Sequence, residues 1–357
     1  MESPTPAMRI GDRRIAPDAR PYVIAEMSAN HGGDLSRALD IIAAAAEAGA
    51  SAIKLQTYTA DTLTIECDKP DFRIDNPESL WNGRTLYDLY EEAHTPWDWH
   101  EPLFEAAREA GIHIFSSPFD ESAVDLLERL ETPAYKIASF ERNFIPLLEK
   151  VAATDKPVIV SCGLATMEDI EESVAALRAA NSGPRCLLTC TSSYPAAIGD
   201  SNLRRIPAMQ AAFPDCQVGL SDHTLGNTAA IAAVALGACV FEKHFKLGDD
   251  DSSVDAAFSV TPGGLRDYVR SIEDAWSALG EAKFGAASEN EAQSAIFRRS
   301  IYVVEDIAEG EELSRENIRC IRPGYGLHPR HFKALLGRKA SRPLERGTPF
   351  SLDMAAD

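Results

Sequence analysis

Eight short runs of apolar and β-branched residues alternate with amphipathic stretches along the first 280 residues. Strands that alternate with helices build parallel sheets, and eight such units close into a barrel. The sequence therefore predicts an α/β fold, a (β/α)8 TIM barrel. The expected strands are 22–26, 52–56, 113–116, 134–138, 158–161, 187–190, 217–220 and 240–243.

Apolar residues at helical spacing predict helices between these strands, at 36–48, 99–110, 122–130, 167–179 and 265–279. Gly49, Gly111 and Gly280 stand where three of them should end. Residues 61–97, which follow the second strand, form an unusually long, aromatic-rich connection. Because a barrel keeps its active site at the C-terminal ends of its strands, we expect this connection to form a wall of the substrate site.

The pattern changes after Gly280, where short β runs separated by Gly and Pro replace the alternation. The spacing Ile307-x-x-Gly310-x-x-Leu313 recurs as Leu344-x-x-Gly347-x-x-Phe350, which predicts two similar hairpin-like elements that face each other. We therefore expect a catalytic barrel at 1–280, a linker at 281–297 and a small β domain at 298–357.

Composition limits the possible partners and location. The 35 Lys and Arg residues against 55 Asp and Glu give a formal net charge of −20, which repels nucleic acid and anionic membranes. The amino terminus lacks the apolar run of a signal peptide, and the longest apolar stretch, 229–241, is too short to span a bilayer. The seven scattered cysteines fit neither a disulfide framework nor a zinc site. We expect a cytoplasmic protein that binds neither nucleic acid nor membrane.

Two lysines lie near the expected strand ends and four serines lie at or just beyond them, where a barrel brings side chains together. Ammonium groups supply charge and hydroxyl groups supply directed donors, so this set predicts an anion pocket. The alternative is that each serine only caps the helix that follows it. The six residues are Lys54, Lys136, Ser117, Ser139, Ser161 and Ser221.

His223 and His244 follow neighbouring strands, so their imidazoles could bind one divalent metal and leave positions open for water and substrate. Two nitrogen ligands without thiolates favour Mn²⁺ over structural zinc. The alternative is two histidines that are hydrogen-bonded to loop carbonyls. Glu26, Glu141 and Asp255 are candidate acids or bases, although each could also be a solvated surface carboxylate.

Seven short motifs are spread along the chain: 24–31 (IAEMSANH), 54–57 (KLQT), 115–119 (FSSPF), 135–141 (YKIASFE), 219–224 (GLSDHT), 242–245 (EKHF) and 322–324 (RPG). With them the chain resembles the sialic acid synthase family nearly from end to end. Residues 80–90 and 95–100 are similar to the pseudaminic acid synthase subgroup of that family.

The resemblance implies an enzyme that condenses phosphoenolpyruvate with the open-chain aldehyde of an N-acetylated amino sugar. It also implies that residues 298–357 form an antifreeze-like (SAF, β-clip) domain that closes over the partner's barrel in a domain-swapped homodimer. The resemblance implies these roles: phosphoenolpyruvate binding by Lys54, Ser117, Lys136, Ser139, Ser161 and Ser221; Mn²⁺ (or Mg²⁺ or Co²⁺) binding by His223 and His244; catalytic proton movement by Glu26; sugar binding by Gln56, Glu141, Tyr194, Asp255 and, from the other subunit, Arg322.

One departure from the family pattern concerns the sugar. Where sialic acid synthases often carry Asn before the Tyr-Pro pair, this chain has Ser192-Ser193-Tyr194, which leaves more room. The resemblance then implies 2,4-diacetamido-2,4,6-trideoxy-L-altrose as substrate, with pseudaminic acid and phosphate as products. Legionaminate and N-acetylneuraminate synthesis are the alternatives within the family.

Two hypotheses come from other classes of protein. Lys54 or Lys136 could attack a carbonyl as in a Schiff-base aldolase, which needs no metal and would resist a chelator. The antifreeze-like tail could belong to a non-catalytic carbohydrate- or ice-binding protein. An ice-binding surface is weakly charged, whereas this tail carries Arg319, Arg322, Arg330, Arg338 and Arg342.

Overall fold

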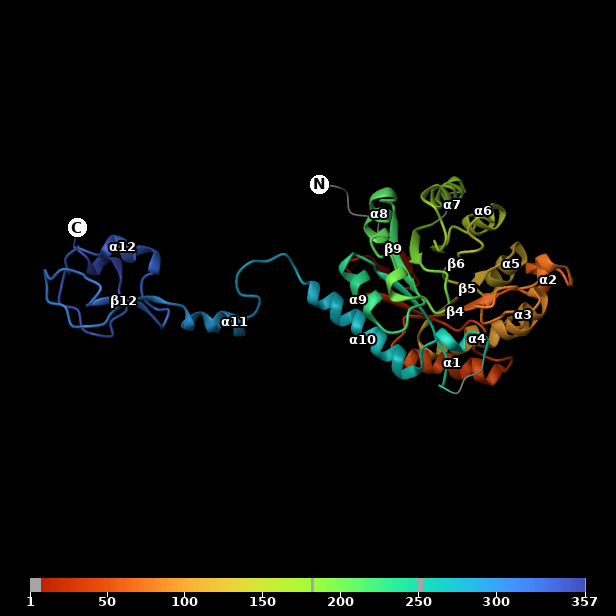
Figure 1. Ribbon diagram of the computed structural model, residues 1–357, viewed down its shortest axis with the longest axis horizontal. Helices are drawn as coiled ribbons and strands as arrows, with labels where there is room; N and C mark the ends of the chain where they lie inside the picture. The colour runs from red at the N-terminus through yellow and green to blue at the C-terminus, as the bar shows by residue number, and fades with distance from the viewer. Residues whose placement is uncertain (1–7, 181–182, 250–252, 357) are drawn as a thin grey trace. The chain divides into compact units, whose positions relative to one another are not determined.

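The first compact unit contains a closed barrel of eight parallel strands (Figure 1). The structure is a computed structural model, and it describes residues 8–180, 183–249 and 253–356. All eight predicted strands are present and pair in chain order, with the last beside the first. The strands are β3 (Tyr22–Glu26), β4 (Ala52–Thr57), β5 (His113–Pro118), β6 (Tyr135–Ile137), β7 (Val158–Ser161), β8 (Arg185–Cys190), β9 (Cys216–Asp222) and β10 (Val240–His244).

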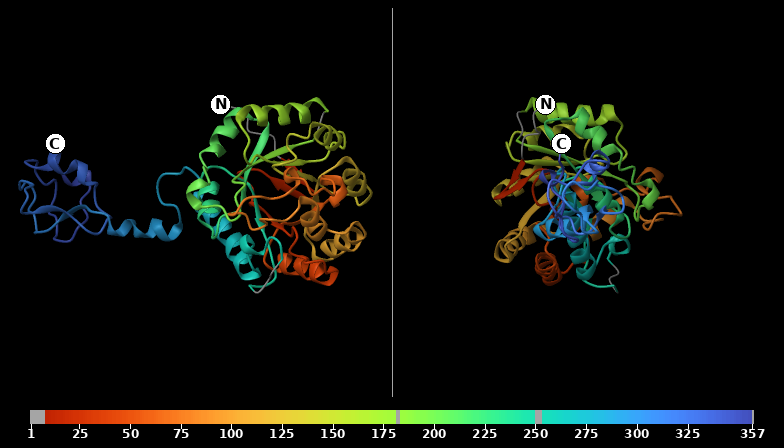
Figure 2. Two further views of the ribbon diagram at one scale, coloured as in Figure 1. Left: turned by 45° about the vertical axis from the view of Figure 1, so that its right-hand side comes forward. Right: turned by 90° about the vertical axis from the view of Figure 1, so that its left-hand side faces the viewer.

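Helices surround this barrel (Figure 2). The five predicted helices are present, and Gly49, Gly111 and Gly280 have positive φ angles of 89°, 73° and 52° where three of them end. The last helix begins three residues before the predicted start, because the Thr261 hydroxyl caps it and Pro262 opens it. The helices are α1 (Leu35–Glu47), α4 (His100–Ala110), α5 (Glu121–Arg129), α6 (Ile145–Ala152), α7 (Met167–Ala179), α8 (Arg205–Ala212), α9 (Thr228–Ala235) and α10 (Pro262–Leu279).

The long connection after β4 is ordered rather than a bare loop. It contains α2 (Ala60–Leu63), a 3₁₀ turn at Pro70–Phe72 and α3 (Leu86–Ala93). The Thr59 and Thr85 hydroxyls cap α2 and α3. Both helices are short, which is why apolar spacing alone did not reveal them.

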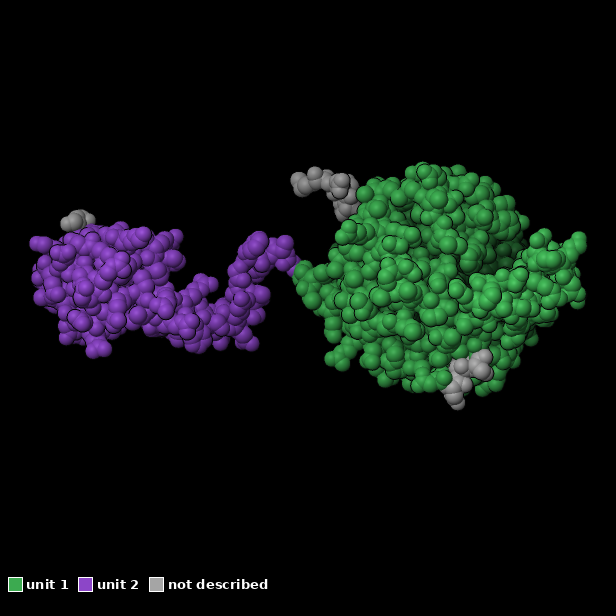
Figure 3. Space-filling view, viewed as in Figure 1, with its two compact units in different colours: residues 1–280 green, residues 281–357 purple. Residues whose placement is uncertain are grey.

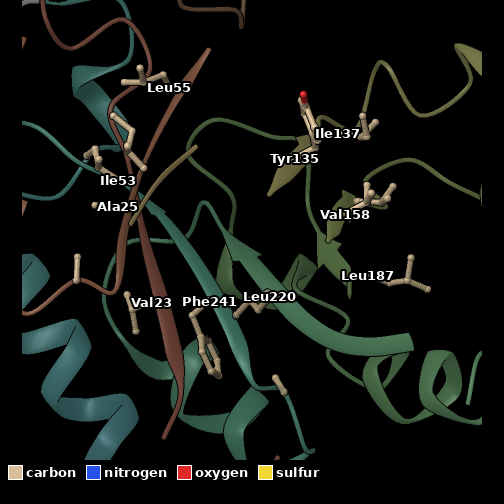
Figure 4. Close-up of a cluster of buried hydrophobic side chains, with 14 of the residues drawn as sticks. Val23, Ala25, Ile53, Leu55, Tyr135, Ile137, Val158, Leu187, Leu220 and Phe241 are labelled. Carbon is tan, nitrogen blue, oxygen red and sulfur yellow. The ribbon is translucent and has the colours of Figure 1, made fainter. Parts of the chain in front are cut away.

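Successive side chains of each strand point to opposite faces, and the two faces form different layers. Outward residues such as Val23, Ile53 and Phe241 pack against the helices in a large apolar cluster (Figure 4). Inward residues near the strand starts, such as Tyr22 and Phe115, form a second apolar cluster. Inward residues near the strand ends are polar, and they form the site described below.

A hairpin that was not anticipated from the sequence covers the starts of the strands. It consists of β1 (Met8–Ile10) and β2 (Arg13–Ile15) in antiparallel pairing. Met8, Ile10 and Ile15 are fully or almost fully buried in the inner apolar cluster. The hairpin therefore closes the end of the barrel opposite the polar strand ends.

The second compact unit covers residues 281–357 (Figure 3). It contains α11 (Glu289–Gln293) and α12 (Phe332–Leu335), with β11 (Ser300–Val303) antiparallel to β12 (Ile318–Ile321). Residues 281–297, expected to be a weakly structured linker, include α11 and a 3₁₀ turn at Ser294–Phe297.

The repeated spacing in this unit corresponds to a pseudo-twofold arrangement. Ile307 and Leu344 donate backbone hydrogen bonds to each other's carbonyl, both 2.9 Å long, so the two elements face each other as predicted. The flanking bonds also occur in pairs offset by 37 residues, as 307 is from 344: Gly310 N to Ala340 O with Gly347 N to Val303 O, and Leu313 N to Arg338 O with Phe350 N to Ile301 O.

Within the described ranges, no helix is both long and apolar enough to cross a membrane. The seven cysteines are all unpaired, and five of them are buried.

The pseudo-twofold core generates a stability prediction. Leu313 is fully buried in the apolar cluster of the second unit, whereas Leu352 is 54% exposed. We expect Leu313→Ala to lower the free energy of unfolding of this unit by about 2–5 kcal/mol, because it leaves a cavity. The matched control Leu352→Ala should change it by about 0.5 kcal/mol or less. Urea titration of the full chain measures both, and equal effects would contradict the assignment of this core.

Candidate active site

A cavity of about 460 Å³ lies at the C-terminal ends of the barrel strands. The structure brings together there all the candidate site residues of the first unit. They are Glu26, Lys54, Gln56, Ser117, Lys136, Ser139, Glu141, Ser161, Tyr194, Ser221, His223, His244 and Asp255. Arg322 lies in the second unit, directly after β12, and is exposed.

The cationic part of the cavity is a buried charge network. Lys54 Nζ lies 2.6 Å from Glu26 Oε2 and 3.8 Å from Glu242 Oε2, and Lys136 Nζ lies 3.2 Å from Glu242 Oε1. All four side chains are at most 6% exposed. Buried ammonium groups need such partners, because desolvation strongly disfavours an isolated charge. Lys54 also donates to Ser117 Oγ at 3.2 Å.

Glu242 is central to this network, although its role could not be predicted from the sequence pattern. Burial by itself would raise the pKa of Glu242, but Lys136 and Lys54 outweigh burial and lower it to about 2. Its Oε1 also accepts a hydrogen bond from Ser221 Oγ at 3.0 Å. The sequence feature that could have indicated this role is the Glu-Lys-His motif, because Glu242 lies two residues before His244 on the same strand and therefore faces inward as His244 does.

Glu26 differs from Glu242 although both are fully buried. Burial raises the pKa of Glu26, and the nearby Glu242 charge adds to the increase, while Lys54 opposes it. Two carboxylates that share ammonium partners commonly divide in this way into one ionised and one more readily protonated group. Glu26 is therefore the carboxylate in this network better suited to exchanging a proton. Gln56 Nε2 donates to Glu26 Oε1 at 2.9 Å and holds it in place.

The serines of the anion pocket do not cap the helices that follow them. The caps of α5, α6, α7 and α9 are Asp120, Phe144, Thr166 and Asn227, so the capping alternative is wrong for these helices. Ser161 Oγ is buried without a hydrogen-bond partner among the described residues. A buried hydroxyl group that faces a cavity and has no hydrogen-bond partner in the protein is available to donate to a ligand.

Gly163 allows two strand-end loops to approach each other beside these serines. Its N–H donates to Ser139 Oγ at 3.2 Å. A Cβ at this position would lie only 2.2 Å from Ser192 Oγ and 2.8 Å from Ser139 Oγ. A side chain here would therefore displace groups that line the pocket.

The two histidine rings lie side by side at the cavity, with centroids 5.3 Å apart and ring planes inclined at 61°. His223 Nδ1 lies 2.9 Å from the Thr191 carbonyl and 3.8 Å from Cys190 Sγ. The alternative of a loop-carbonyl hydrogen bond thus holds for His223, and that bond leaves Nε2 free to bind a ligand. His244 Nδ1 is buried without a hydrogen-bond partner among the described residues.

Burial lowers the pKa of His244 well below its usual range, and the nearby imidazole of His223 lowers it further. His244 is therefore neutral near pH 7, which is the form that can bind a metal. The rings of Tyr194 and Phe258 pack around the pair, with centroids 4.4 Å from His223 and 4.8 Å from His244, respectively.

The predicted substrate wall is present and is largely apolar. Trp81 lies 6.2 Å from Tyr194, centroid to centroid, and donates from Nε1 to the Val254 carbonyl at 3.3 Å. That hydrogen bond ties the segment after β4 to the segment after β10. The segment between β4 and α4 also supplies seven further cavity-lining residues: Tyr58, Leu63, Ile74, Leu86, Leu89, Tyr90 and Ala93.

Asp255 and Ser28 form a polar contact between this wall and the histidines. Ser28 Oγ donates to Asp255 Oδ2 and accepts from Gln56 Nε2 at 2.9 Å. Burial raises the pKa of Asp255, and its Oδ2 lies 4.0 Å from His244 Nδ1. Ser28 lies in the 24–31 motif but, like Cys190, was not selected, because strand-end position does not reveal which side chains turn inward.

Comparison with known proteins agrees with this geometry. Residues 41–284 match the NeuB family, and residues 298–356 match the SAF domain. The chain belongs to the NeuB family. These matches confirm the expected family and the barrel with a C-terminal SAF domain.

Individual relatives match over most of their length. A pseudaminic acid synthase from Campylobacter jejuni is 44% identical over 340 residues, 95% of this chain and 97% of that protein. An N,N'-diacetyllegionaminic acid synthase from Legionella pneumophila is 34% identical over 92% of each chain. The crystal structure of an N-acetylneuraminic acid synthetase from Leptospira borgpetersenii, 30% identical, has a TM-score of 0.71 over 81% of this chain and 96% of that one.

The environment of Glu141 predicts a pH dependence of stability. Burial raises the pKa of Glu141 from 4.5 to about 7. The folded state therefore holds this proton more tightly than the unfolded chain does. The contribution of protonated Glu141 to the free energy of unfolding is present below pH 4.5 and is lost as the pH rises through about 7. After discounting for partial exposure, we expect a loss of about 2 kcal/mol.

Glu141→Gln should remove that part of the pH dependence and make the protein more stable than the wild type at pH 8. Glu149→Gln, which changes the charge at an exposed position of α6, is the control. Urea unfolding between pH 5 and 8 measures the effect. If wild type and Glu141→Gln change in parallel with pH, the proposed environment of Glu141 is wrong.

Proposed function

We propose that this chain catalyses the pseudaminic acid synthase reaction. Phosphoenolpyruvate condenses with 2,4-diacetamido-2,4,6-trideoxy-L-altrose and water to give pseudaminic acid and phosphate. The observation that carries the proposal is the cavity that combines Lys54, Lys136 and Glu242 with the facing pair His223 and His244. The relative that is 44% identical over 95% of the chain supports the choice of sugar.

Phosphoenolpyruvate would bind at the cationic end of the cavity. Lys54 and Lys136 supply two buried ammonium groups, and hydrogen bonds to charged groups are strong where water is excluded. Ser117, Ser139 and Ser161 would donate to the phosphate and carboxylate oxygens, and Ser221 would do so when its hydroxyl turns away from Glu242. The unpartnered hydroxyl of Ser161 supports this role.

A divalent metal fits beside the two histidines. His244 is neutral, and its Nδ1 has no hydrogen-bond partner among the described residues, while His223 is oriented through Nδ1. No cluster of three or more His, Cys, Asp or Glu ligands occurs in the part of the chain that the structure describes. Two imidazoles, with Mn²⁺ as the metal that suits them, would leave positions for water and substrate. When bound, the metal would polarise the aldehyde oxygen as a Lewis acid.

The side chains around the reacting atoms would then guide three bond changes. C3 of phosphoenolpyruvate attacks the aldehyde carbon, water adds to C2, and the resulting tetrahedral centre loses phosphate to leave the 2-keto acid. Lys54 and Lys136 would stabilise the negative charge on the departing phosphate. Glu26, with its raised pKa, would accept the proton from the attacking water.

The far end of the sugar would contact the apolar wall. Lys54, Lys136 and Glu242 lie within strands, whereas the wall follows the end of β4 and therefore lies nearer the mouth of the cavity. In an open-chain sugar, C6 is the carbon farthest from the reacting C1. A 6-deoxy sugar would place its methyl group against this wall, while Gln56, Glu141, Tyr194 and Asp255 would contact polar substituents.

We also propose that the protein forms a homodimer in which the SAF domains are exchanged. The exposed guanidinium of Arg322 would reach the N-acyl group of a sugar bound in the other subunit, since its planar donors suit a carbonyl oxygen.

The lysine environment disfavours a Schiff-base aldolase. Burial by itself would lower the pKa of Lys54, but Glu242 and Glu26 outweigh burial and raise it. A protonated ammonium cannot attack a carbonyl, so Lys54 is suited to binding an anion rather than to covalent catalysis.

Phosphate release from phosphoenolpyruvate, measured with a panel of N-acetylated sugars, tests the function. We expect release with the altro-configured diacetamido sugar, dependence on Mn²⁺, and loss of activity with EDTA. Mass spectrometry and NMR would identify pseudaminic acid as the product. Release with N-acetylmannosamine or the legionaminate precursor would move the assignment within the family. Metal-independent condensation of pyruvate with a sugar, which releases no phosphate, would favour the aldolase, and no reaction with any sugar would reject the enzymatic assignment.

The apolar wall predicts a change in selectivity. Leu86→Gln should reduce kcat/KM for the 6-deoxy sugar and narrow its advantage over the 6-hydroxy counterpart, which we expect to be about 10–100-fold in the wild type. Leu80→Gln is the matched control, because Leu80 is 52% exposed and does not line the cavity. Unchanged selectivity in Leu86→Gln would show that the sugar methyl group binds elsewhere.

A further inference from the structure

A buried ion pair lies directly behind the two histidines, on the outer face of the barrel. Asp222 on β9 and Lys243 on β10 are direct neighbours in the parallel register. Their side chains are both 0% exposed, with Lys243 Nζ 3.0 Å from Asp222 Oδ2. Each is followed by one of the two histidines. Because side chains alternate along a strand, the ion pair faces the helices while the histidines face the cavity.

Both members of this ion pair also form hydrogen bonds with Thr224, the residue that follows His223. Lys243 Nζ donates to the Thr224 carbonyl, and Asp222 Oδ1 accepts from Thr224 N at 2.9 Å and from Thr224 Oγ1 at 2.7 Å. The ring of Tyr268 on α10 lies 5.2 Å from the same ammonium group. The backbone before and after His223 is thus fixed to β10, and we call Lys243, Asp222 and Thr224 the clamp.

A charge pair in this position is not explained by stability alone. The neighbouring outer layer consists largely of apolar side chains, and apolar residues of similar volume often stabilise a protein as well as a buried ion pair does. The clamp supplies what apolar packing does not, namely directed bonds that fix the end of β9 relative to the end of β10. The spacing of the two imidazoles depends on that relation.

We propose that Lys243 is a positioning residue that holds His223 and His244 at the spacing needed to bind the divalent metal. The inference rests on the proposed function, because that function places the metal at the two histidines. The cationic end of the cavity does not need the clamp. Glu242 is held from inside the barrel by Lys136 and Ser221, at 3.2 and 3.0 Å. Loss of the clamp should therefore weaken metal binding while leaving phosphoenolpyruvate binding in place.

The test uses the full chain with Lys243→Met and Asp222→Asn combined, so that no unpaired charge stays buried. Calorimetry would measure the Kd for Mn²⁺ after chelator treatment and, separately, the Kd for phosphoenolpyruvate without metal. We expect the Mn²⁺ Kd to rise about tenfold or more, as for other groups that orient metal ligands. The phosphoenolpyruvate Kd should change less than about twofold. The visible spectrum of the Co²⁺-loaded variant should differ from that of the wild type, because the ligand geometry changes.

Asp215→Asn is the matched control, because it breaks the ion pairs of Asp215 with Arg185 (2.8 Å) and Arg178 (2.5 Å) at the starts of β8 and β9, the ends away from the histidines. It should leave the Mn²⁺ Kd and the Co²⁺ spectrum unchanged. If the double variant does not fold, Thr224→Val decides, since it removes only the Thr224 hydroxyl bond and should raise the Mn²⁺ Kd several-fold.

Three results would overturn the inference. One is a folded double variant, or a folded Thr224→Val where only that variant folds, with the wild-type Mn²⁺ Kd and Co²⁺ spectrum. Another is an equal loss of phosphoenolpyruvate binding, which would indicate general distortion of the cavity. A wild type that binds no Mn²⁺ would overturn both the clamp and the proposed metal site, whereas normal wild-type binding with unaffected variants would overturn the clamp alone.

Discussion

The buried charge network is the interaction on which the rest of the site depends. Lys54 and Lys136 share Glu26 and Glu242 inside a barrel, where an uncompensated ammonium would be strongly disfavoured. The two glutamates neutralise the two lysines, which allows the two ammonium groups to stay close together. They supply a local cationic region in a protein whose net charge is −20. The same network shifts the pKa values of the two carboxylates in opposite directions, so that Glu242 remains ionised and Glu26 holds a proton more readily.

The strands supply the order that this network needs. Along the inner face, apolar residues near the strand starts give way to polar residues near the ends, while outward residues pack against the helices. The hairpin β1–β2 closes the apolar end, and the segment between β4 and α4 bounds the polar end. One cavity thus contains a cationic region, an imidazole pair and an apolar wall. This order of environments suits an anionic substrate at one end and the apolar end of a second substrate at the other.

Much of the barrel could be predicted from the sequence because its signal is local. The eight strands and the helix ends at Gly49 and Gly111 follow from side-chain periodicity and backbone preference within a few residues. The hairpin β1–β2 could not, because its stability comes from packing onto distant strands of the barrel. The helices α2, α3 and α6 could not, because each is too short for apolar spacing alone to reveal it. The repeat in the second unit was visible because paired elements must present matching residues to each other.

For the site, the residues at the strand ends could be identified from the sequence, because the alternation of strands and helices assigns those positions. The folded barrel was needed to show that Glu242 joins the two lysines, that Cys190 and Thr191 contact His223, and that Asp222 and Lys243 lie behind the histidines. Those relations depend on which side of a strand each side chain faces and on the register between neighbouring strands. A shift of one residue would exchange the inner and outer faces, and only the closed barrel fixes the register that places the imidazoles inside and the ion pair outside.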